Sequence, residues 1–231
     1  MVIAIDGPAG SGKSTIAKLL AQNLKGPDGQ EFTYINSGNL YRAVTLGCLR
    51  AKIDPSDSEK VIEFAKNVII SYHKDQVFLE GEDVTGLLHT DEIDRFSAPL
   101  SAIVPVRHIV NDLIRSLAQG RNIVVEGRDM TTVVFPDARC RFYLDASAQM
   151  RAKRRFEQGV SNLSLEDIKN AILQRDEIDK NKAEGSLKIA EGVHFLDTSL
   201  LTIVQVYEKL IEEIDQNLRK EDGWHGSGVG H

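Results

Sequence analysis

A run of residues near the start of the chain has the types and spacing of a loop that binds a polyphosphate. Its members are Gly7, Pro8, Ala9, Gly10, Ser11, Gly12, Lys13, Ser14 and Thr15, which satisfy the pattern G-x-x-x-x-G-K-[ST]. Glycines let the backbone turn its N–H groups inward around phosphates, and the start of the following helix adds positive potential. The pattern predicts that Lys13 reaches the β- and γ-phosphates of ATP and that Ser14 binds Mg²⁺. The alternative is a glycine-rich turn that binds nothing.

Two further turns place arginines beside small or acidic residues. The first contains Ser37, Tyr41 and Arg42, and the second contains Glu126, Arg128 and Asp129. An arginine at the start of a helix can hold a phosphate through two parallel hydrogen bonds. Carboxylates that flank an arginine at a sheet edge cost desolvation free energy unless they bind a ligand or a metal. A structural ion pair is the alternative for the second group.

Two stretches with a helical pattern carry most of the remaining candidate cations. They contain Arg151, Arg154 and Arg155 in one case, and Arg175, Asp179 and Lys182 in the other. The second set shares a helical face by i, i+4, i+7 spacing and could hold a phosphate and a ribose together. The first set predicts a hinged lid that closes over ATP and excludes water. A solvated helix face is the alternative.

Several cationic elements around one phosphate loop suit a reaction that brings two polyphosphate anions together. Such a reaction depends mainly on positioning and on neutralising charge. The pattern therefore predicts a kinase.

Five short apolar runs must position these residues, and they alternate with helical patterns. The runs are residues 2–5, 32–35, 122–125, 141–144 and 193–196. This layout predicts a parallel sheet with helices on both faces, with ligands at the carboxyl edge of its strands. More than one crossover helix must fill the long interval between the second and third runs. Residues 68–73 and 77–80 within it have a hairpin pattern, so we expect a small antiparallel insert at residues 60–97.

Composition narrows the class of protein. The 231 residues are 42% hydrophobic and carry a formal net charge of -6, which fits one α/β domain with an insertion and disfavours a nucleic-acid partner. The N-terminus shows neither a signal peptide nor a membrane span, so we expect a cytoplasmic protein. The six histidines form no metal pattern with the cysteines. Residues 221–231 are polar and glycine-rich and are expected to form a disordered tail.

Several of these segments closely resemble the bacterial cytidylate kinases, a family of nucleoside monophosphate kinases, along residues 2–218. The matching segments are residues 5–15, 37–38, 41–42, 79–85, 127–130, 132–138, 143–147 and 175–176, together with Asp179. The segments at 79–85 and 127–138 are far more specific than the phosphate loop, and they favour CMP over AMP or UMP as the acceptor.

The resemblance implies a fold, an activity and a set of site residues. The implied fold is a P-loop kinase of the α/β class: a five-stranded parallel sheet flanked by helices in residues 1–59 and 98–220, an antiparallel CMP-binding insert in residues 60–97, and a helical lid at about residues 148–185. The implied activity is transfer of the γ-phosphoryl group of ATP to CMP or dCMP, and a monomer is favoured. The implied acceptor site contains Ser37, Tyr41, Arg42, Ser97, Arg107, Arg128, Asp129, Arg175, Asp179 and Lys182.

Within that set, the resemblance assigns Arg42, Arg128 and Arg175 to the acceptor phosphate. Asp179 is assigned to the ribose, and Asp129 with Arg107 to the cytosine edge. A carboxylate that accepts from the cytosine amino group, beside an arginine that donates to the ring, forms a pairing that uracil cannot satisfy equally. Lys13, Arg128, Arg151 and Arg155 are the expected catalytic residues, and Arg154 is expected to bind ATP with the loop.

The chain departs from the family pattern at several positions. Glu126 replaces an aspartate, Thr131 a glycine and Lys182 an arginine, while the serine expected to face cytosine falls at Ala98, next to Ser97. A lysine keeps the charge of an arginine but loses its planar fork. A kinase for another acceptor and a nucleotide sensor without catalysis remain the competing interpretations.

Overall fold

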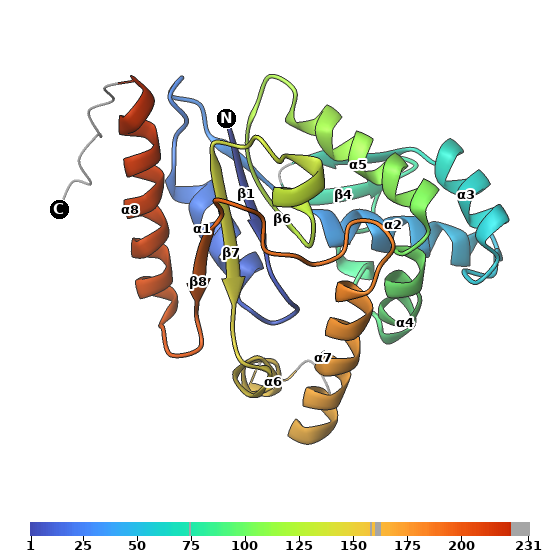
Figure 1. The fold of residues 1–231 in the computed structure, drawn as a ribbon. Helices are drawn as coiled ribbons and strands as arrows, with labels where there is room; N and C mark the ends of the chain where they lie inside the picture. Colours follow the sequence, from blue (N-terminus) through green and yellow to red (C-terminus); the bar gives the residue numbers. More distant parts are fainter. Residues whose placement is uncertain (74, 158, 160–162, 223–231) are drawn as a thin grey trace.

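The computed structural model describes residues 1–73, 75–157, 159 and 163–222. Five parallel strands form the central sheet in the order β2-β6-β1-β7-β8 (Figure 1). Their bounds are β1 Val2–Asp6, β2 Phe32–Asn36, β6 Asn122–Gly127, β7 Cys140–Asp145 and β8 His194–Asp197. Each overlaps its predicted run, so the prediction of a five-stranded parallel sheet is confirmed.

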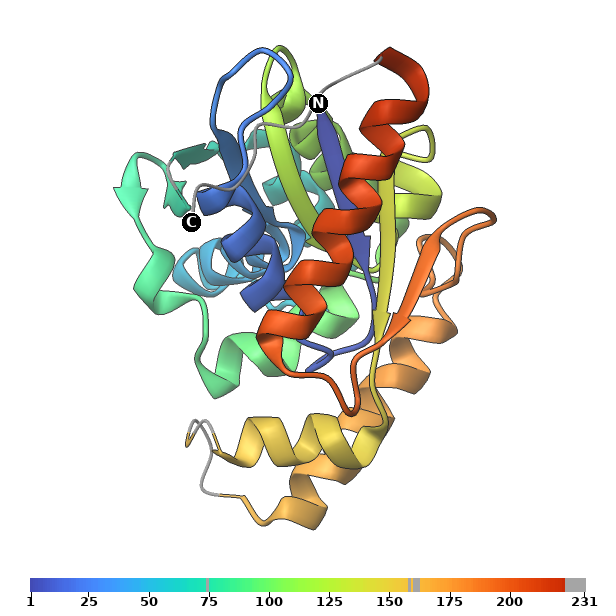
Figure 2. The same cartoon turned by 90° about the vertical axis from the view of Figure 1, so that its left-hand side faces the viewer.

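Helices cover both faces of this sheet, as Figures 1 and 2 show. One face packs against α1 (Lys13–Asn23) and α8 (Ile203–Asp222) through one hydrophobic core. The other face packs against α2 (Ser37–Arg50) and α5 (Val104–Ala118) through a second core. Because both faces are covered, the central strands read as nearly continuous apolar runs rather than alternating ones.

A second, antiparallel sheet lies beside α2. It comprises β3 (Ile70–His73), β4 (Gln76–Leu79) and β5 (Glu82–Asp83), followed by a 3₁₀ turn at Thr85–Leu87. The predicted hairpin is therefore confirmed, and β5 adds a third strand. Buried side chains of β3 and β4 belong to the same hydrophobic core as those of α2 and β6.

The insert is framed by two helices. They are α3 (Ser58–Asn67) and α4 (Asp91–Leu100), which extend beyond residues 60 and 97 at either end. Asp57 caps α3 by accepting from the backbone N–H of Lys60, and Thr90 caps α4 in the same way at Ile93. The division of the chain at residues 60–97 stays a prediction.

Helices α6 (Ala148–Glu157) and α7 (Leu165–Lys180) project past the carboxyl ends of the strands (Figure 2). They pack on each other through a small core of Ala152, Ile168 and Ile172. This pair occupies the region expected to form the lid.

Helix α8 continues to Asp222, two residues into the stretch expected to be a disordered tail. The rest of that stretch, residues 223–231, lies outside the described residues. No helix in the described part of the chain is long and apolar enough to cross a membrane.

Strand register brings the polar strand ends to one edge. Asp6 at the end of β1 pairs with Gly127 of β6, and Asn36 of β2 pairs with Glu126. Because the strands are parallel, the loop after each strand opens on the same side. The site is therefore expected at this edge.

Candidate active site

The phosphate loop lies between β1 and α1, as predicted. Gly12 has a φ of 93°, a left-handed conformation that glycine adopts without steric cost, and it directly precedes the first residue of α1. The Lys13 side chain is buried and donates to the carbonyl oxygen of Pro8 (2.7 Å) and to Oγ of Ser11 (3.4 Å). Burial, followed by charge repulsion from Arg128, lowers the pKa of Lys13 to about 7.

Ser14 and Thr15 are exposed at the N-terminus of α1. A hydroxyl oxygen is a ligand that Mg²⁺ accepts, and this ion needs few protein ligands because it keeps several waters and binds phosphates. No cluster of three histidine, cysteine or acidic side chains suited to a metal occurs in the residues that the structure describes. The exposed hydroxyl of Ser14 is a group that could serve as one ligand of such an ion.

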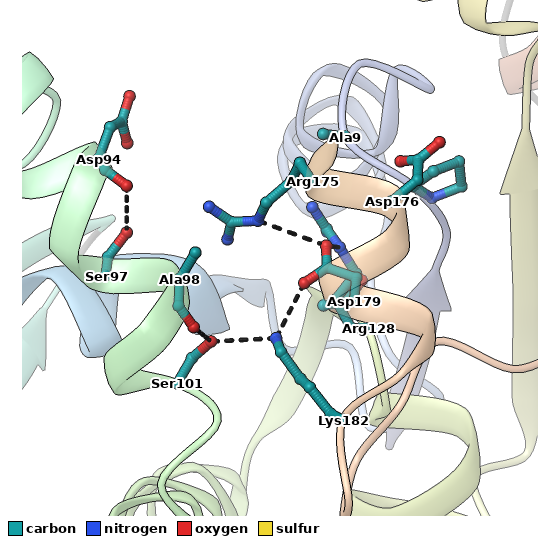
Figure 3. Close-up of polar contacts among 12 residues, drawn as sticks. Ala9, Asp94, Ser97, Ala98, Ser101, Arg128, Arg175, Asp176, Asp179 and Lys182 are labelled. Atoms are coloured by element: carbon teal, nitrogen blue, oxygen red, sulfur yellow. Dashed lines mark hydrogen bonds and ion pairs between the residues drawn. The ribbon is translucent and has the colours of Figure 1, made fainter. Parts of the chain in front are cut away.

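Asp179 is the centre of the predicted acceptor site. Its carboxylate is fully buried; Oδ2 lies 2.6 Å from Nε of Arg128 and 3.5 Å from Nε of Arg175, and Oδ1 lies 2.8 Å from Nζ of Lys182 (Figure 3). Burial by itself raises the pKa of Asp179, but these cations more than offset that effect and hold the pKa well below its ordinary value. Asp179 is therefore ionised, and it fixes three cations around one point.

The prediction that Lys182 lies on the helical face of Arg175 and Asp179 is wrong in one respect. Helix α7 ends at Lys180, so Lys182 belongs to the following segment and not to the helix. It still reaches Asp179, because the chain folds back after the helix, where the backbone N–H of Leu187 donates to the carbonyl oxygen of Asp179 (2.7 Å). The lysine side chain is buried there.

Ser101 is a site residue that the sequence did not single out. Its hydroxyl donates to the carbonyl oxygen of Ala98 (2.7 Å) and accepts from Nζ of Lys182 (3.0 Å), as Figure 3 shows. The predicted Ser97 is also buried, but its hydroxyl donates to the backbone oxygen of Asp94 in its own helix. No local pattern marks Ser101, because its partner is 81 positions away.

Arg107 and Asp129 form a buried ion pair, which brings together the two residues expected to read the base. Another nitrogen of Arg107 donates to the backbone oxygen of Ser101 (2.7 Å). The ring of Tyr41 lies 5.7 Å from the Arg107 guanidinium, and the buried Tyr41 hydroxyl has no hydrogen-bond partner among the described residues. The Tyr41 hydroxyl, next to this buried ion pair, is thus a group to which a ligand could bond.

Ser37 is the first residue of α2, and Arg42 lies in the second turn of the same helix. Ser37 is buried, and Arg42 pairs with Asp94 of α4 at 2.8 Å. Glu126 supports this turn from β6, because its Oε1 accepts from the Tyr34 hydroxyl (2.6 Å) and from the Asn36 side-chain amide (2.9 Å). Glu126 therefore reaches across from β6 to β2.

Asp6 is a second residue that the sequence analysis did not assign. Its carboxylate accepts from the backbone N–H groups of Met130 (2.9 Å) and Thr131 (2.7 Å) and from the Thr131 hydroxyl (2.7 Å). Burial raises the pKa of Asp6 to about 6, although these hydrogen bonds act in the opposite direction. The Thr131 hydroxyl thus adds a donor that ties β1 to the turn after Arg128.

The three arginines of α6 have different surroundings. Arg151 is buried and donates to the carbonyl oxygen of Ala9 in the phosphate loop (3.0 Å), which excludes a solvated face for this residue. Arg154 donates to Oγ1 of Thr198 (3.1 Å), which in turn donates to the carbonyl oxygen of Ser11 (3.1 Å). Arg155 is half-exposed and lies 3.8 Å from Asp94.

A pocket of about 370 Å³ lies beside α6 and the loop after β8. Its lining comprises Met150, Lys153, Arg154, Glu157, Ser199, Leu200, Leu201 and Thr202. After Ser101 and Asp6, this loop is the third part of the site that the sequence did not indicate. It carries no charged motif, and only its contact with the phosphate loop through Thr198 marks it.

The fold and these contacts define a class. A parallel α/β sheet with a glycine-rich loop after its first strand, next to a pair of helices and a cluster of cations, is that of an ATP-dependent P-loop kinase. The model of the family described as cytidylate kinase matches residues 3–216. The chain therefore belongs to the cytidylate kinase family.

Curated relatives agree with this family. A cytidylate kinase of Caldanaerobacter subterraneus subsp. tengcongensis is 41% identical over 222 residues, which cover 95% of this chain and 96% of the relative. A cytidylate kinase of Thermodesulfovibrio yellowstonii is 39% identical over 225 residues, covering 94% and 98%. A solved structure of an uncharacterized protein from Eubacterium ventriosum shares the fold with a TM-score of 0.52 at 13% identity, covering 94% of this chain and 98% of that protein.

Proposed function

We propose that this protein transfers the γ-phosphoryl group of ATP to CMP or dCMP, which yields ADP and CDP or dCDP. The observation that carries the proposal is the closeness of the two cationic centres. Arg128, bonded to Asp179 in the acceptor cluster, follows Gly127, which pairs with Asp6 directly before the phosphate loop. The positive charge of Arg128 accordingly helps to lower the pKa of Lys13. Two anions held by these centres would meet end to end, as in-line transfer requires.

On the donor side, the backbone N–H groups of the loop and the start of α1 would hold the triphosphate. Lys13 would leave the Pro8 carbonyl oxygen and bond to the β- and γ-phosphates. Mg²⁺, with Ser14 as a ligand, would neutralise charge on the phosphate oxygens when bound. The adenine base would occupy the pocket between Arg154 and the loop after β8, which is joined to the phosphate loop through Thr198.

On the acceptor side, Arg42, Arg128 and Arg175 would bind the CMP phosphate, with Lys182 as a further cation. Asp179 would accept from the ribose hydroxyls. Arg107 and Asp129 would read the cytosine edge, next to the unpartnered hydroxyl of Tyr41. Since Ser97 is bonded within its own helix, we assign a hydroxyl near the base to Ser101 instead.

The lid would complete the site. Arg151 already contacts the phosphate loop, whereas Arg155 is half-exposed and has to move to reach the transferred phosphoryl group. Closure would exclude water, which otherwise competes with CMP for the phosphoryl group.

The test is a purified-protein assay of ATP and Mg²⁺ with CMP, dCMP, UMP and AMP. We expect CMP and dCMP to be the best acceptors, and Asp129→Ala should raise KM for CMP more than it lowers kcat. Preference for UMP or AMP would favour a kinase for another acceptor, and nucleotide binding without ADP release would favour a sensor. We also expect a cytoplasmic monomer, which gel filtration and cell fractionation check.

A further inference from the structure

Asp94 is a carboxylate of α4 that contacts two arginines from different elements. Its Oδ1 accepts from Nε (3.1 Å) and Nη2 (2.8 Å) of Arg42 in α2. Its Oδ2 lies 3.8 Å from Nη2 of Arg155 in α6. Each carboxylate oxygen thus faces a cation, one from the acceptor site and one from the lid.

The contact fixes the direction of Arg42. One oxygen of Asp94 accepts from both Nε and Nη2 of Arg42, so that edge of the guanidinium is occupied. The opposite side, which carries Nη1, is turned away from Asp94. Nη1 lies over the first turn of α2, where a methyl group on Gly38 would lie 3.0 Å from it. The start of α2 also carries the positive end of the helix dipole, so a phosphate bound there meets both the backbone and Arg42.

The position of Asp94 is itself well defined. Its backbone N–H donates to the carbonyl oxygen of Thr90, the residue that caps α4, and its backbone oxygen accepts from Ser97. Figure 3 shows its carboxylate directed away from Ser97. The side chains of Arg42 and Asp94 are 20% and 32% exposed, so the pair itself contributes little to the free energy of folding.

Arg155 gives the second half of the argument. At 3.8 Å its contact with Asp94 is an ion pair without a hydrogen bond, so the arginine is attracted to α4 but remains able to move. Asp94 therefore draws a lid cation toward the place where it already aims Arg42.

We propose that Asp94 is a positioning residue for phosphoryl transfer: it aims Arg42 at the acceptor phosphate and draws Arg155 of the lid to the same point. The proposal rests on the proposed function, because it takes the phosphate of the acceptor nucleotide as the anion that both arginines meet.

The experiment compares Asp94→Ala and Asp94→Asn with the parent, with Glu92→Ala as a matched control. Glu92 is an exposed carboxylate two positions earlier in the same helix. Steady-state kinetics gives KM for CMP, KM for ATP and kcat, and calorimetry gives Kd for CMP without ATP. Thermal unfolding shows whether each variant is folded.

The two substitutions separate the two contacts. In Asp94→Ala both are lost, so KM and Kd for CMP should rise about tenfold and kcat should fall several-fold, with KM for ATP unchanged. In Asp94→Asn the amide oxygen still accepts from Arg42 but no longer attracts Arg155. KM for CMP should therefore return to within about threefold of the parent while kcat stays low. Glu92→Ala should match the parent.

Two outcomes would overturn the proposal. If KM and kcat of Asp94→Ala stay within twofold of the parent, the contact is only a surface ion pair. If KM for CMP falls below that of the parent, Asp94 competes with the acceptor phosphate for Arg42. If Asp94→Ala fails to fold, the same criteria apply to kcat of Asp94→Asn. A parent that does not phosphorylate CMP contradicts the proposed function instead, and the variants are then compared on whichever monophosphate the parent accepts.

Discussion

Arg151 of α6 and Asp176 of α7 form a buried ion pair in which two guanidinium nitrogens meet two carboxylate oxygens, at 3.1 and 2.6 Å. The same arginine donates to the carbonyl oxygens of Ala9 and Ala146. One side chain therefore joins α6 and α7 to the loop after β1. Part of the attachment of α6 and α7 therefore depends on the hydrogen bonds of this one side chain.

Asp176→Ala leaves Arg151 buried without its charged partner, a change that costs about 3–5 kcal/mol in typical proteins. We expect faster amide hydrogen exchange in α6 and α7 and at least about a tenfold loss of kcat, while the central sheet keeps its protection. Glu166→Gln in the exposed first turn of α7 is the control. Unchanged exchange in both helices would show that the pair does not hold the lid.

Lys13→Met should reduce kcat by about two to three orders of magnitude and leave the fold intact, because it removes a preorganised donor to the transferred phosphate. The buried ammonium carries a desolvation cost, so the free energy of unfolding should not fall at neutral pH. A coupled ADP-release assay and a thermal melt measure the two effects. Normal turnover would mean that the phosphate loop is wrongly assigned.

ATP binding should take up protons above neutral pH. In the unliganded protein the pKa of Lys13 lies at about 7, below its ordinary value, so the side chain is mostly neutral at pH 8. Bound phosphates favour the charged form and raise this pKa, so uptake should approach about one proton per site, and affinity should fall as pH rises past 7. Calorimetry of MgATP binding in buffers of different ionisation enthalpy measures the uptake, and Lys13→Met should abolish most of it. Equal proton uptake in parent and variant would contradict the assignment.

Gly185→Ala should weaken CMP binding through the base site. Gly185 has a φ of +62°, and a methyl group there would collide with the Arg107 guanidinium and the Asp129 carboxylate. We expect KM for CMP to rise at least about tenfold and the preference for CMP over UMP to shrink, with little change in KM for ATP. Kinetics with both acceptors measures this.

Gly120→Ala is the matched control for that substitution, because Gly120 has a φ of +68° and no atom within 4 Å of the added methyl group. It carries the same backbone strain without the collision. If both variants lose CMP affinity equally, strain and not contact with the Arg107 and Asp129 pair is the cause.

The sequence by itself determined the strands and the place of the glycine-rich loop. Apolar runs that end at Asp6, Asn36 and Asp145 define strands whose carboxyl ends share an edge, and the pattern from Gly7 to Thr15 predicts a phosphate site between the first strand and its helix. These features depend on periodicity and on bonds between near neighbours, which a single segment contains. The cations of α6 and α7 were recognisable for the same reason.

Only the tertiary structure decided the pairing of the charges. Arg128 meets Asp179 across 51 positions, and Arg107 meets Asp129 rather than an acid of its own helix. Packing also brings three further parts to the same edge of the sheet, namely Ser101, Asp6 and the loop after β8. A local pattern shows which charges exist, but the partner that satisfies a buried charge is fixed by strand register and helix packing, which depend on the whole chain at once.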